Sequence, residues 1–399
     1  MRKQPGAGAR NWRLARRKGE YRMHVDFVIV GGGISGAAAA YFLSQAGKVA
    51  LIEQEPHFGF HSSGRTAGQF TVGISADQMR AMAGASRAFF HAPPAGFSDL
   101  PLIEQRGSLT VGRLAQKAVL DKLHERIGQA GGTAEWVDRE QAKVLFPALL
   151  ADKFDLGVHE TDAQDIDVNT LLQAYLKGAK RNGAVLATNA PVQGIERHDG
   201  KWCVRTQDEN YTAGVMINAA GGWADVIARM AGVAPVGITP YKRTAFTFPL
   251  LPGAQGARWP HVCNADYQWY VKPEHGCFMG SPADAQPVAP GEVYPDELDV
   301  AQGIYNIEQE TSLRVPRPIS VWAGVRSYAR DRDPVCGARA ESPDFIWYAA
   351  LGGCGVLTSP AMGQAVAALA QRKALPDALR ARGLTPEALS PDRAALGST

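Results

Sequence analysis

The sequence predicts a two-domain protein in which an α/β unit is joined to a unit built largely of antiparallel β-strands. Near the start of the chain, residues 25–55 show the pattern strand, glycine turn, helix and strand, which is typical of a parallel α/β sheet. Between residues 240 and 317, aromatic residues alternate with polar ones between tight Pro/Gly turns, which indicates an antiparallel sheet. Residues 320–371 return to the first pattern, so the α/β unit is expected to be discontinuous along the chain.

The glycines of the first segment have the spacing of a nucleotide-binding turn. Gly31, Gly33 and Gly36 form G-x-G-x-x-G directly after the apolar strand expected at residues 25–30. In this motif the first glycine permits a tight turn, the second lets the backbone approach a pyrophosphate, and the third lets the helix pack on the strand. Glu53 follows the second expected strand, at the spacing of an acid that binds ribose hydroxyls. The segment therefore predicts dinucleotide binding, and the alternative is a glycine-rich turn that binds nothing.

The other elements are expected from apolar periodicity and from turn residues. Helices are expected at residues 37–46, 76–92, 116–130, 167–181, 297–313 and 358–371. Strands are expected at residues 49–52, 185–187, 192–197, 202–206, 215–220, 320–326 and 345–351. Asp167 is expected to cap its helix, and Asp199-Gly200 to form a hairpin turn.

Two further segments are expected beside the dinucleotide. The loop after the second strand carries Ser62, Ser63, Arg65 and Thr66, whose side chains can reach phosphates or hydroxyls. The alternative is a solvated Ser/Gly loop. The strand at residues 215–220 ends in glycines, which permit a second close approach of the backbone to the ligand.

Charge is distributed unevenly over the 399 residues. The chain has 42 Lys/Arg and 39 Asp/Glu, but residues 1–22 hold eight of the basic residues and one acid. The remainder has 34 basic and 38 acidic residues, a net charge of −4, which gives no support for nucleic-acid binding. We expect residues 1–22 to be a disordered extension before Met23; a targeting segment or a polyanion-binding arm is the alternative. No apolar run has the length of a membrane span.

The five cysteines are scattered along the sequence. They form no C-x-x-C pair and no His/Cys group at zinc-ligand spacing. We therefore expect neither a disulfide framework nor a metal site, and predict a cytoplasmic location.

Four separated motifs carry a family resemblance. They are VIVGGGISG…LIEQE, HSSGRTAG, NAAGGWA and WAGVRSYARDRDPVCG…ALGGCGVLTSPAMG. With these motifs in this order, the chain resembles the flavin-dependent glycine/D-amino acid oxidase (DAO) family from residue 23 to about residue 391. Within that family, stretches such as ASRAFFHAPPAGF and GVRSYARDRD are similar to the bacterial D-arginine and D-amino acid dehydrogenases.

The resemblance implies a glutathione-reductase-like variant of the Rossmann fold, α/β plus antiparallel β, that binds FAD. The FAD-binding domain would comprise residues 23–99, 158–234 and 322–399, and the substrate-binding domain residues 100–157 and 235–321. The residues expected at the cofactor are Gly31, Gly33, Ile34, Ser35, Gly36, Glu53, Gln54, Ser62, Ser63, Arg65, Thr66, Ala67, Val192, Ala220, Gly221, Gly352, Gly355, Val356 and Thr358. The turn at 352–356 would lie at the pyrimidine side of the flavin, where a helix N-terminus favours the anionic reduced ring.

The resemblance also implies three substrate-binding residues. Arg243 in YKRTAF and Arg326 in WAGVRSY match arginines that bind the substrate carboxylate, and Tyr270 in WYVKP matches a tyrosine that hydrogen-bonds to it. Gly353 and Cys354 are expected at the same pocket. The alternatives are salt bridges at a domain edge for the arginines and a packed sheet aromatic for the tyrosine.

Departures from the D-arginine dehydrogenase pattern change the expected substrate. The glutamate that binds the substrate guanidinium is replaced by Ser108, and a tyrosine and a histidine of that pocket by Ile74 and Gln69. An uncharged pocket attracts a guanidinium weakly, so D-arginine is not expected to be preferred. Glu104 could supply the missing acid only if its strand were shifted.

The implied reaction is oxidation of the Cα–N bond of a D-amino acid or a related carboxylate-bearing amine by hydride transfer to flavin N5. The imino acid would hydrolyse to a 2-oxo acid and ammonia, and the electron acceptor would be a quinone, a dye-like acceptor or O₂. Alternatives are oxidation of an N-methyl amino acid, an imino acid or a 2-hydroxy acid, a hydroxylase that uses NAD(P)H, and a non-catalytic flavoprotein.

Overall fold

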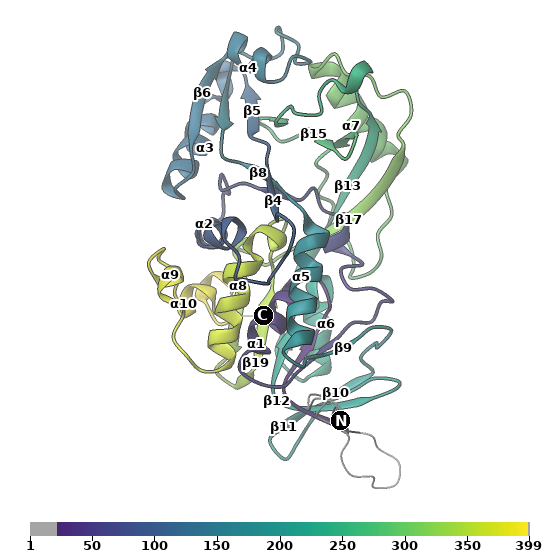
Figure 1. Ribbon diagram of the computed structural model, residues 1–399, viewed down its shortest axis with the longest axis vertical. Coiled ribbons are helices and arrows are strands. Elements are labelled where there is room, and N and C mark those ends of the chain that lie inside the picture. The colour runs from purple at the N-terminus through teal and green to yellow at the C-terminus, as the bar shows by residue number, and fades with distance from the viewer. Residues whose placement is uncertain (1–21, 398–399) are drawn as a thin grey trace, which may run out of the picture.

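The computed structural model describes residues 22–397, which form two units stacked along the long axis of the molecule (Figure 1). The first 21 residues of the expected N-terminal extension lie outside this range, and a strand begins at Arg22. Each unit is built on an eight-stranded sheet, and a small three-stranded sheet lies beside them. The expected combination of α/β and antiparallel β architecture is confirmed.

The first sheet is the parallel core of the lower unit in Figure 1. Its order is β10-β11-β12-β1-β2-β9, and β19 pairs with both β12 and β18. The bounds are β1 Arg22–Val30, β2 Val49–Ile52, β9 Val185–Ala187, β10 Gly194–His198, β11 Lys201–Arg205, β12 Asn210–Asn218, β18 Val335–Arg339 and β19 Ser342–Ala349. The pairs β1–β12, β1–β2, β2–β9 and β12–β19 are parallel, while the β10–β11 and β11–β12 pairs are antiparallel.

Helices cover both faces of this sheet. Four of them, α1 (Ile34–Leu43), α2 (Asp77–His91), α5 (Val168–Arg181) and α8 (Gly355–Ala370), share one apolar core that includes Ile29 and Leu51. The other face is covered by α6 (Ala224–Met230), in a core that includes Val28 and Ile52. Neighbouring strand residues thus point to opposite faces, and both faces are apolar, as expected for a buried parallel strand.

The second sheet forms the upper unit in Figure 1. Its order is β17-β13-β16-β15-β14-β5-β7-β6, and every pair is antiparallel except β14–β5. The bounds are β5 Ser108–Gly112, β6 Ala134–Asp138, β7 Leu156–Glu160, β13 Thr239–Pro249, β14 His261–Asn264, β15 Tyr270–Glu274, β16 Cys277–Ser281 and β17 Ser320–Tyr328. The helices of this unit are α3 (Lys117–Gln129), α4 (Arg139–Leu145) and α7 (Glu297–Glu310). Residues of α4 and α7 share the core under one face of the sheet, so the other face is left for the first unit.

The third sheet consists of β3 (Gln69–Phe70), β8 (Gln164–Ile166) and β4 (Ile103–Gln105). The short elements are α9 (Asp377–Arg380), α10 (Pro386–Leu389) and the 3₁₀ turns η1 (Ser62–Arg65), η2 (Leu114–Gln116), η3 (Gly221–Trp223), η4 (Pro252–Ala254) and η5 (Ala394–Leu396). None of the helices in the described range is long and apolar enough to cross a membrane.

The structure refines several expected element and domain bounds. Strands β7 and β17 belong to the second sheet, so the expected boundaries at residues 158 and 322 pass through strands. Asp167 caps α5 through a bond from the Thr170 N–H to its Oδ1 (2.8 Å), as predicted. Both α1 and α8 begin three residues earlier than the apolar pattern suggested, which brings their first N–H groups to the preceding glycine turns.

Candidate active site

One long cavity lies between the loops at the ends of the first sheet and the free face of the second sheet. About 1630 Å³ of space that no atom fills lies along it, part of which is open to solvent. Most of the residues predicted from the sequence line it: Gly31, Gly33, Ile34, Ser35, Glu53, Gln54, Ser62, Ser63, Arg65, Thr66, Ala67, Val192, Ala220, Gly221, Arg243, Tyr270, Arg326, Gly352, Gly353, Gly355 and Val356.

Two of the three motif glycines at one end of the cavity have no room for a side chain. Gly31 has φ +106°, and a Cβ there would lie 2.4 Å from the carbonyl oxygen of Ala219 on the neighbouring strand. A Cβ on Gly36 would lie 1.8 Å from the carbonyl oxygen of Gly31. At Gly33 the nearest atom to an added Cβ is Ser63 Oγ at 3.3 Å, so this glycine leaves room on the cavity side. The space at Gly31 and Gly36 is thus limited by the protein backbone, while the role of Gly33 at a pyrophosphate stays a prediction.

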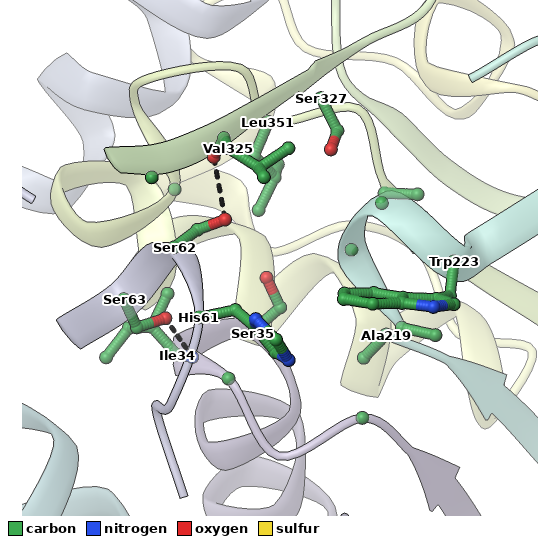
Figure 2. A pocket seen from close by; sticks show the side chains of 18 of the residues that line it. Ile34, Ser35, His61, Ser62, Ser63, Ala219, Trp223, Val325, Ser327 and Leu351 are labelled. Carbon is green, nitrogen blue, oxygen red and sulfur yellow. Dashed lines mark hydrogen bonds between the residues drawn. The ribbon is translucent and has the colours of Figure 1, made fainter. Parts of the chain in front are cut away.

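Two serines hold the loop that follows β2 against both units (Figure 2). The Ile34 N–H, in the first turn of α1, donates to Ser63 Oγ (2.9 Å). The Ser62 hydroxyl donates to the Val325 carbonyl on β17 (2.7 Å). These bonds fix the loop between the glycine turn and the second sheet, so it forms the middle of the cavity wall.

Glu53 is buried at the end of β2. Its carboxylate accepts hydrogen bonds from the Gly32 N–H (2.6 Å) and the Glu55 N–H (2.9 Å). Burial raises the pKa of Glu53, while the two N–H donors favour its charged form. The acid predicted to contact a ribose therefore also stabilises the glycine turn.

The other end of the cavity is formed by one face of the second sheet. In the β13–β17 pair Tyr241 lies opposite Arg326 and Arg243 lies opposite Gly324. Directly opposite residues share a face, and so do residues two apart on one strand, so both arginines point to the same side. Both of them line the cavity together with Tyr270 of β15.

The two buried arginines differ in their electrostatic surroundings. Within residues 22–397, Nε and Nη1 of Arg243 are buried without a hydrogen-bond partner. Burial, followed by repulsion from Arg326, lowers the pKa of Arg243. Burial also disfavours the charge of Arg326, but the phenol oxygens of Tyr267, Tyr270 and Tyr328 outweigh it and raise its pKa. A buried guanidinium with unpaired donors beside a second one is suited to bind an anion.

A glycine turn lies against the guanidinium of Arg326. A Cβ on Gly353 would lie 3.0 Å from both Cζ and Nε of Arg326. The next residue, Cys354, is the N-cap of α8, and burial raises the pKa of its thiol to about 11. This thiol is therefore protonated at neutral pH and is not a nucleophile.

Of the other residues expected in the substrate pocket, only Gly353 lines the cavity, and Gln69, Ile74, Ser108 and Cys354 do not. Ile74 packs against the core of the first unit, and Gln69 lies on β3 of the third sheet. Ser108 lies on β5 beside His261 of β14, with 3.3 Å between Ser108 Oγ and His261 Nδ1. The parallel β14–β5 pair sets this position, and a sequence pattern does not reveal such a pairing.

Some expected cofactor residues have other contacts. The Arg65 guanidinium donates to the Ala323 carbonyl (3.0 Å) and pairs with Glu292 (3.0 Å). Thr358 lies one turn inside α8, where its hydroxyl donates to the Cys354 carbonyl (2.8 Å). Gly36, Cys354 and Thr358 are absent from the cavity wall, as far as the described residues show.

Aromatic residues near the cavity were not predicted. His61 and Trp223 line the cavity (Figure 2), and their rings lie 4.7 Å apart. His61 Nε2 lies 2.9 Å from Glu55 Oε1. The ring of Tyr267 lies 6.0 Å from that of Tyr270. His61 begins the HSSGR segment, which could have indicated it, whereas Tyr267 has no such signal.

No group of three or more His, Cys, Asp or Glu residues in the described range could hold a metal ion. All five cysteines lie in the described range, and none of them forms a disulfide bond.

Comparison with known proteins places the chain in a family. The DAO model, described as FAD dependent oxidoreductase, matches residues 26–369. The chain is 24% identical over 371 residues to the mitochondrial dimethylglycine dehydrogenase of Rattus norvegicus, covering 86% of this chain but only 43% of that protein. It is 23% identical to the glycine oxidase of Bacillus licheniformis, covering 87% of this chain and 93% of the oxidase.

Solved structures share the fold. The L-proline dehydrogenase from P. horikoshii superposes with a TM-score of 0.79 at 23% identity, covering 92% of this chain and 97% of that one. At this level of identity the similarity concerns the fold alone.

The residues of the cavity fit FAD. The open side of Gly33 and the first turn of α1, whose N-cap Gly33 has no side chain, suit a pyrophosphate, although the Ile34 N–H is already bonded to Ser63 Oγ. The N-cap of α8, Cys354, makes no side-chain capping bond beside the Arg326 chamber. The chain belongs to the DAO family of FAD-dependent oxidoreductases, and FAD is its cofactor.

Proposed function

We propose that this protein oxidises the Cα–N bond of a D-amino acid, or of a related small amine that carries a carboxylate. The product imino acid hydrolyses in water to a 2-oxo acid and ammonia. The observation that carries the proposal is the pair of arginines, Arg243 and Arg326, on one face of the second sheet, with unpaired buried donors on Arg243.

The chain's own residues bind and orient the substrate. Arg326 presents its guanidinium from β17, where Gly353 packs against it, and Arg243 presents a second from β13. Tyr270 adds a phenol hydroxyl from β15. A carboxylate bound by these groups neutralises the repulsion between the arginines and fixes the Cα relative to the cavity.

FAD supplies the hydride acceptor when bound. From the resemblance, we place the turn at 352–356 at the pyrimidine side of its ring. Because a neutral amine can lose a hydride without a strong base, positioning is the main contribution of the protein.

The side-chain environment argues against D-arginine. Ser108 stands where the substrate-binding acid was expected to be, and Glu104 is exposed on β4. Asp165, which faces the second sheet, is already paired with Lys272 (2.9 Å) and Arg106 (2.7 Å). Asp284 accepts hydrogen bonds from the Thr244 N–H (2.6 Å) and the Thr244 hydroxyl (3.1 Å). Among the described residues, neither Asp165 nor Asp284 lines the cavity, so neither is placed to bind a substrate guanidinium there.

Small amines are the favoured class. The similar proteins include a glycine oxidase and a dimethylglycine dehydrogenase, which supports glycine-like and N-methylated amino acids as the second candidate class. The acceptor, whether quinone, dye or O₂, and a cytoplasmic location stay predictions.

The test is anaerobic reduction of the purified holoenzyme with a panel of D- and L-amino acids, N-methyl amino acids, imino acids and 2-hydroxy acids. Loss of the oxidised flavin absorbance with small carboxylate-bearing amines is the expected result. A flavin that no member of the panel reduces would contradict the proposal and favour a non-catalytic flavoprotein, while reduction by NAD(P)H would favour a hydroxylase. An oxygen electrode then separates oxidase from dehydrogenase.

A further inference from the structure

Tyr267 has an unusual backbone conformation next to the substrate chamber. It lies in the loop between β14 and β15, three residues before Tyr270, and has φ +53°. This left-handed region is unfavourable for a bulky residue and persists only where the surroundings impose it. The conformation of Tyr267 therefore suggests a functional role for this residue.

Helix α7 imposes the conformation. The Tyr267 N–H donates to the Asn264 carbonyl (2.9 Å), and Asn264 Oδ1 accepts from the Gln268 N–H (2.8 Å). From α7, Glu310 Oε1 accepts from Asn264 Nδ2 (3.0 Å), and Asn306 Nδ2 donates to the Gln268 carbonyl (2.9 Å). The turn is thus held on both sides of Tyr267 by a helix that lies outside the cavity wall.

The side chain of Tyr267 reaches from the surface to the arginines. Its ring stacks on that of Tyr270 at 6.0 Å and 26°, and the guanidinium carbon of Arg243 lies 5.7 Å from its centre. Burial around the hydroxyl raises its pKa, and the charges of Arg326 and Arg243 oppose this rise. Since 42% of the residue is nevertheless exposed, its hydroxyl end lies inward and other parts of the residue meet solvent.

The inner side of the chamber is already filled. Tyr270 packs there in a buried cluster with Ala245, Cys263 and Met279. Tyr267 is partly exposed and stacks on Tyr270, just behind the residues that line the cavity, so its ring supports the wall from the solvent side.

We infer that Tyr267 is a specificity-determining residue: a fixed outer wall of the chamber that restricts it to short carboxylate-bearing amines. Asn264, Asn306 and Glu310 are positioning residues, because they hold the turn that directs this ring. The inference rests on the proposed function and adds to it the residue that limits substrate length.

The test compares four holoenzyme variants. Tyr267→Gly removes the ring and also accepts the positive φ, so folding is preserved; Tyr267→Ala removes the ring alone. Tyr267→Phe keeps the ring, and Tyr305→Ala is the matched control, an exposed tyrosine on α7 (59%). Two readouts are used: acetate titration followed by flavin absorbance, and anaerobic flavin reduction by a short and a long amine of one homologous series.

The expected result is a change in relative rates. For each amine, the rate of flavin reduction is divided by the dissociation constant of that amine. The ratio of this value for the long amine to that for the short amine rises about tenfold in Tyr267→Gly and Tyr267→Ala. The acetate dissociation constant also rises in both. Tyr267→Phe keeps the wild-type ratio, as does Tyr305→Ala.

The positioning residues give an independent readout. Asn306→Ala and Glu310→Gln are expected to raise the same ratio by about threefold and to weaken substrate binding, with the maximal reduction rate unchanged. A merely structural role would lower stability without moving the ratio.

The possible failures are distinguishable. A wild-type ratio in Tyr267→Gly, with normal acetate binding to the wild-type protein, overturns this inference and leaves the proposed function intact. A wild-type flavin spectrum that does not respond to acetate, together with no reduction by any amine, overturns the proposed function and this inference with it.

Discussion

Replacing Gly353 by alanine tests whether the position of the Arg326 guanidinium controls substrate binding. The added Cβ would lie 3.0 Å from Cζ and Nε of Arg326 and 3.1 Å from Nη1. An ordinary contact begins near 3.4 Å, so the guanidinium must move by roughly half an ångström. Gly353 does not have a positive φ, so alanine adds no backbone strain at this position.

The expected cost follows from this displacement. A shift of about 1 Å in a positioned group costs about a hundredfold, so half of it costs about tenfold, or about 1.4 kcal/mol. We therefore expect Gly353→Ala to weaken acetate binding about tenfold, and to lower amine-dependent flavin reduction to a similar degree.

A double-mutant cycle isolates the effect. Acetate is titrated into the holoenzyme as wild type, Gly353→Ala, Arg326→Ala and the double variant, and flavin absorbance reports binding. In the Arg326→Ala background no guanidinium remains to be displaced, so Gly353→Ala should have no further effect. An equal tenfold loss in both backgrounds would refute the reasoning, because the added methyl group would then be acting on the flavin environment.

Two buried side chains, His261 and Lys272, give further measurable predictions. Burial, followed by the charge of Lys272, lowers the pKa of His261 to about 3. Between about pH 3 and 6.5 the unfolded chain therefore binds more protons at this residue than the folded protein does. The free energy of unfolding consequently falls as the pH falls through this window. Between pH 6.5 and 5, His261→Phe should lose about 2 kcal/mol less of its free energy of unfolding than the wild type does. The measurement is Tm as a function of pH, which should be flatter in the variant. A slope equal to that of the wild type would contradict this prediction. Lys272 is 2% exposed and pairs with Asp165 (2.9 Å) and Glu274 (2.7 Å). Lys272→Met should cost about 3 kcal/mol in urea unfolding, and an unchanged midpoint would show that these pairs contribute little.

The cofactor half of the site could be predicted from the sequence because its determinants are local. The glycine turn, Glu53 and the two serines of the next loop all lie within residues 31–63, and the structure brings them to one cavity wall. The helix starts were predicted late because the apolar pattern begins at Ala37, whereas α1 begins at Ile34, directly after the glycines. The same difference occurs at α8, which begins at Gly355.

The substrate half depends on pairings between distant segments. Arg243 and Arg326 meet through the β13–β17 register, and the family resemblance supplied this pair where local patterns could not. Ser108 was expected in the pocket, but the β14–β5 pair places it beside His261, 153 positions away. The conformation of Tyr267 depends on hydrogen bonds to α7, which no local pattern encodes.

The most direct test of the account compares amines that differ only in the carboxylate: D-alanine with ethylamine, sarcosine with dimethylamine, and glycine with methylamine. Anaerobic flavin reduction is measured for the wild-type holoenzyme and for the Arg243→Ala/Arg326→Ala variant. For any pair that reduces the wild-type flavin, we expect the amine with the carboxylate to reduce it at least about a hundredfold more efficiently than the amine without it. The reason is that buried charge pairs contribute several kcal/mol. In the variant this preference should fall to within about tenfold. Equal reduction of the wild-type flavin with and without the carboxylate would contradict the claim that the two arginines bind the substrate.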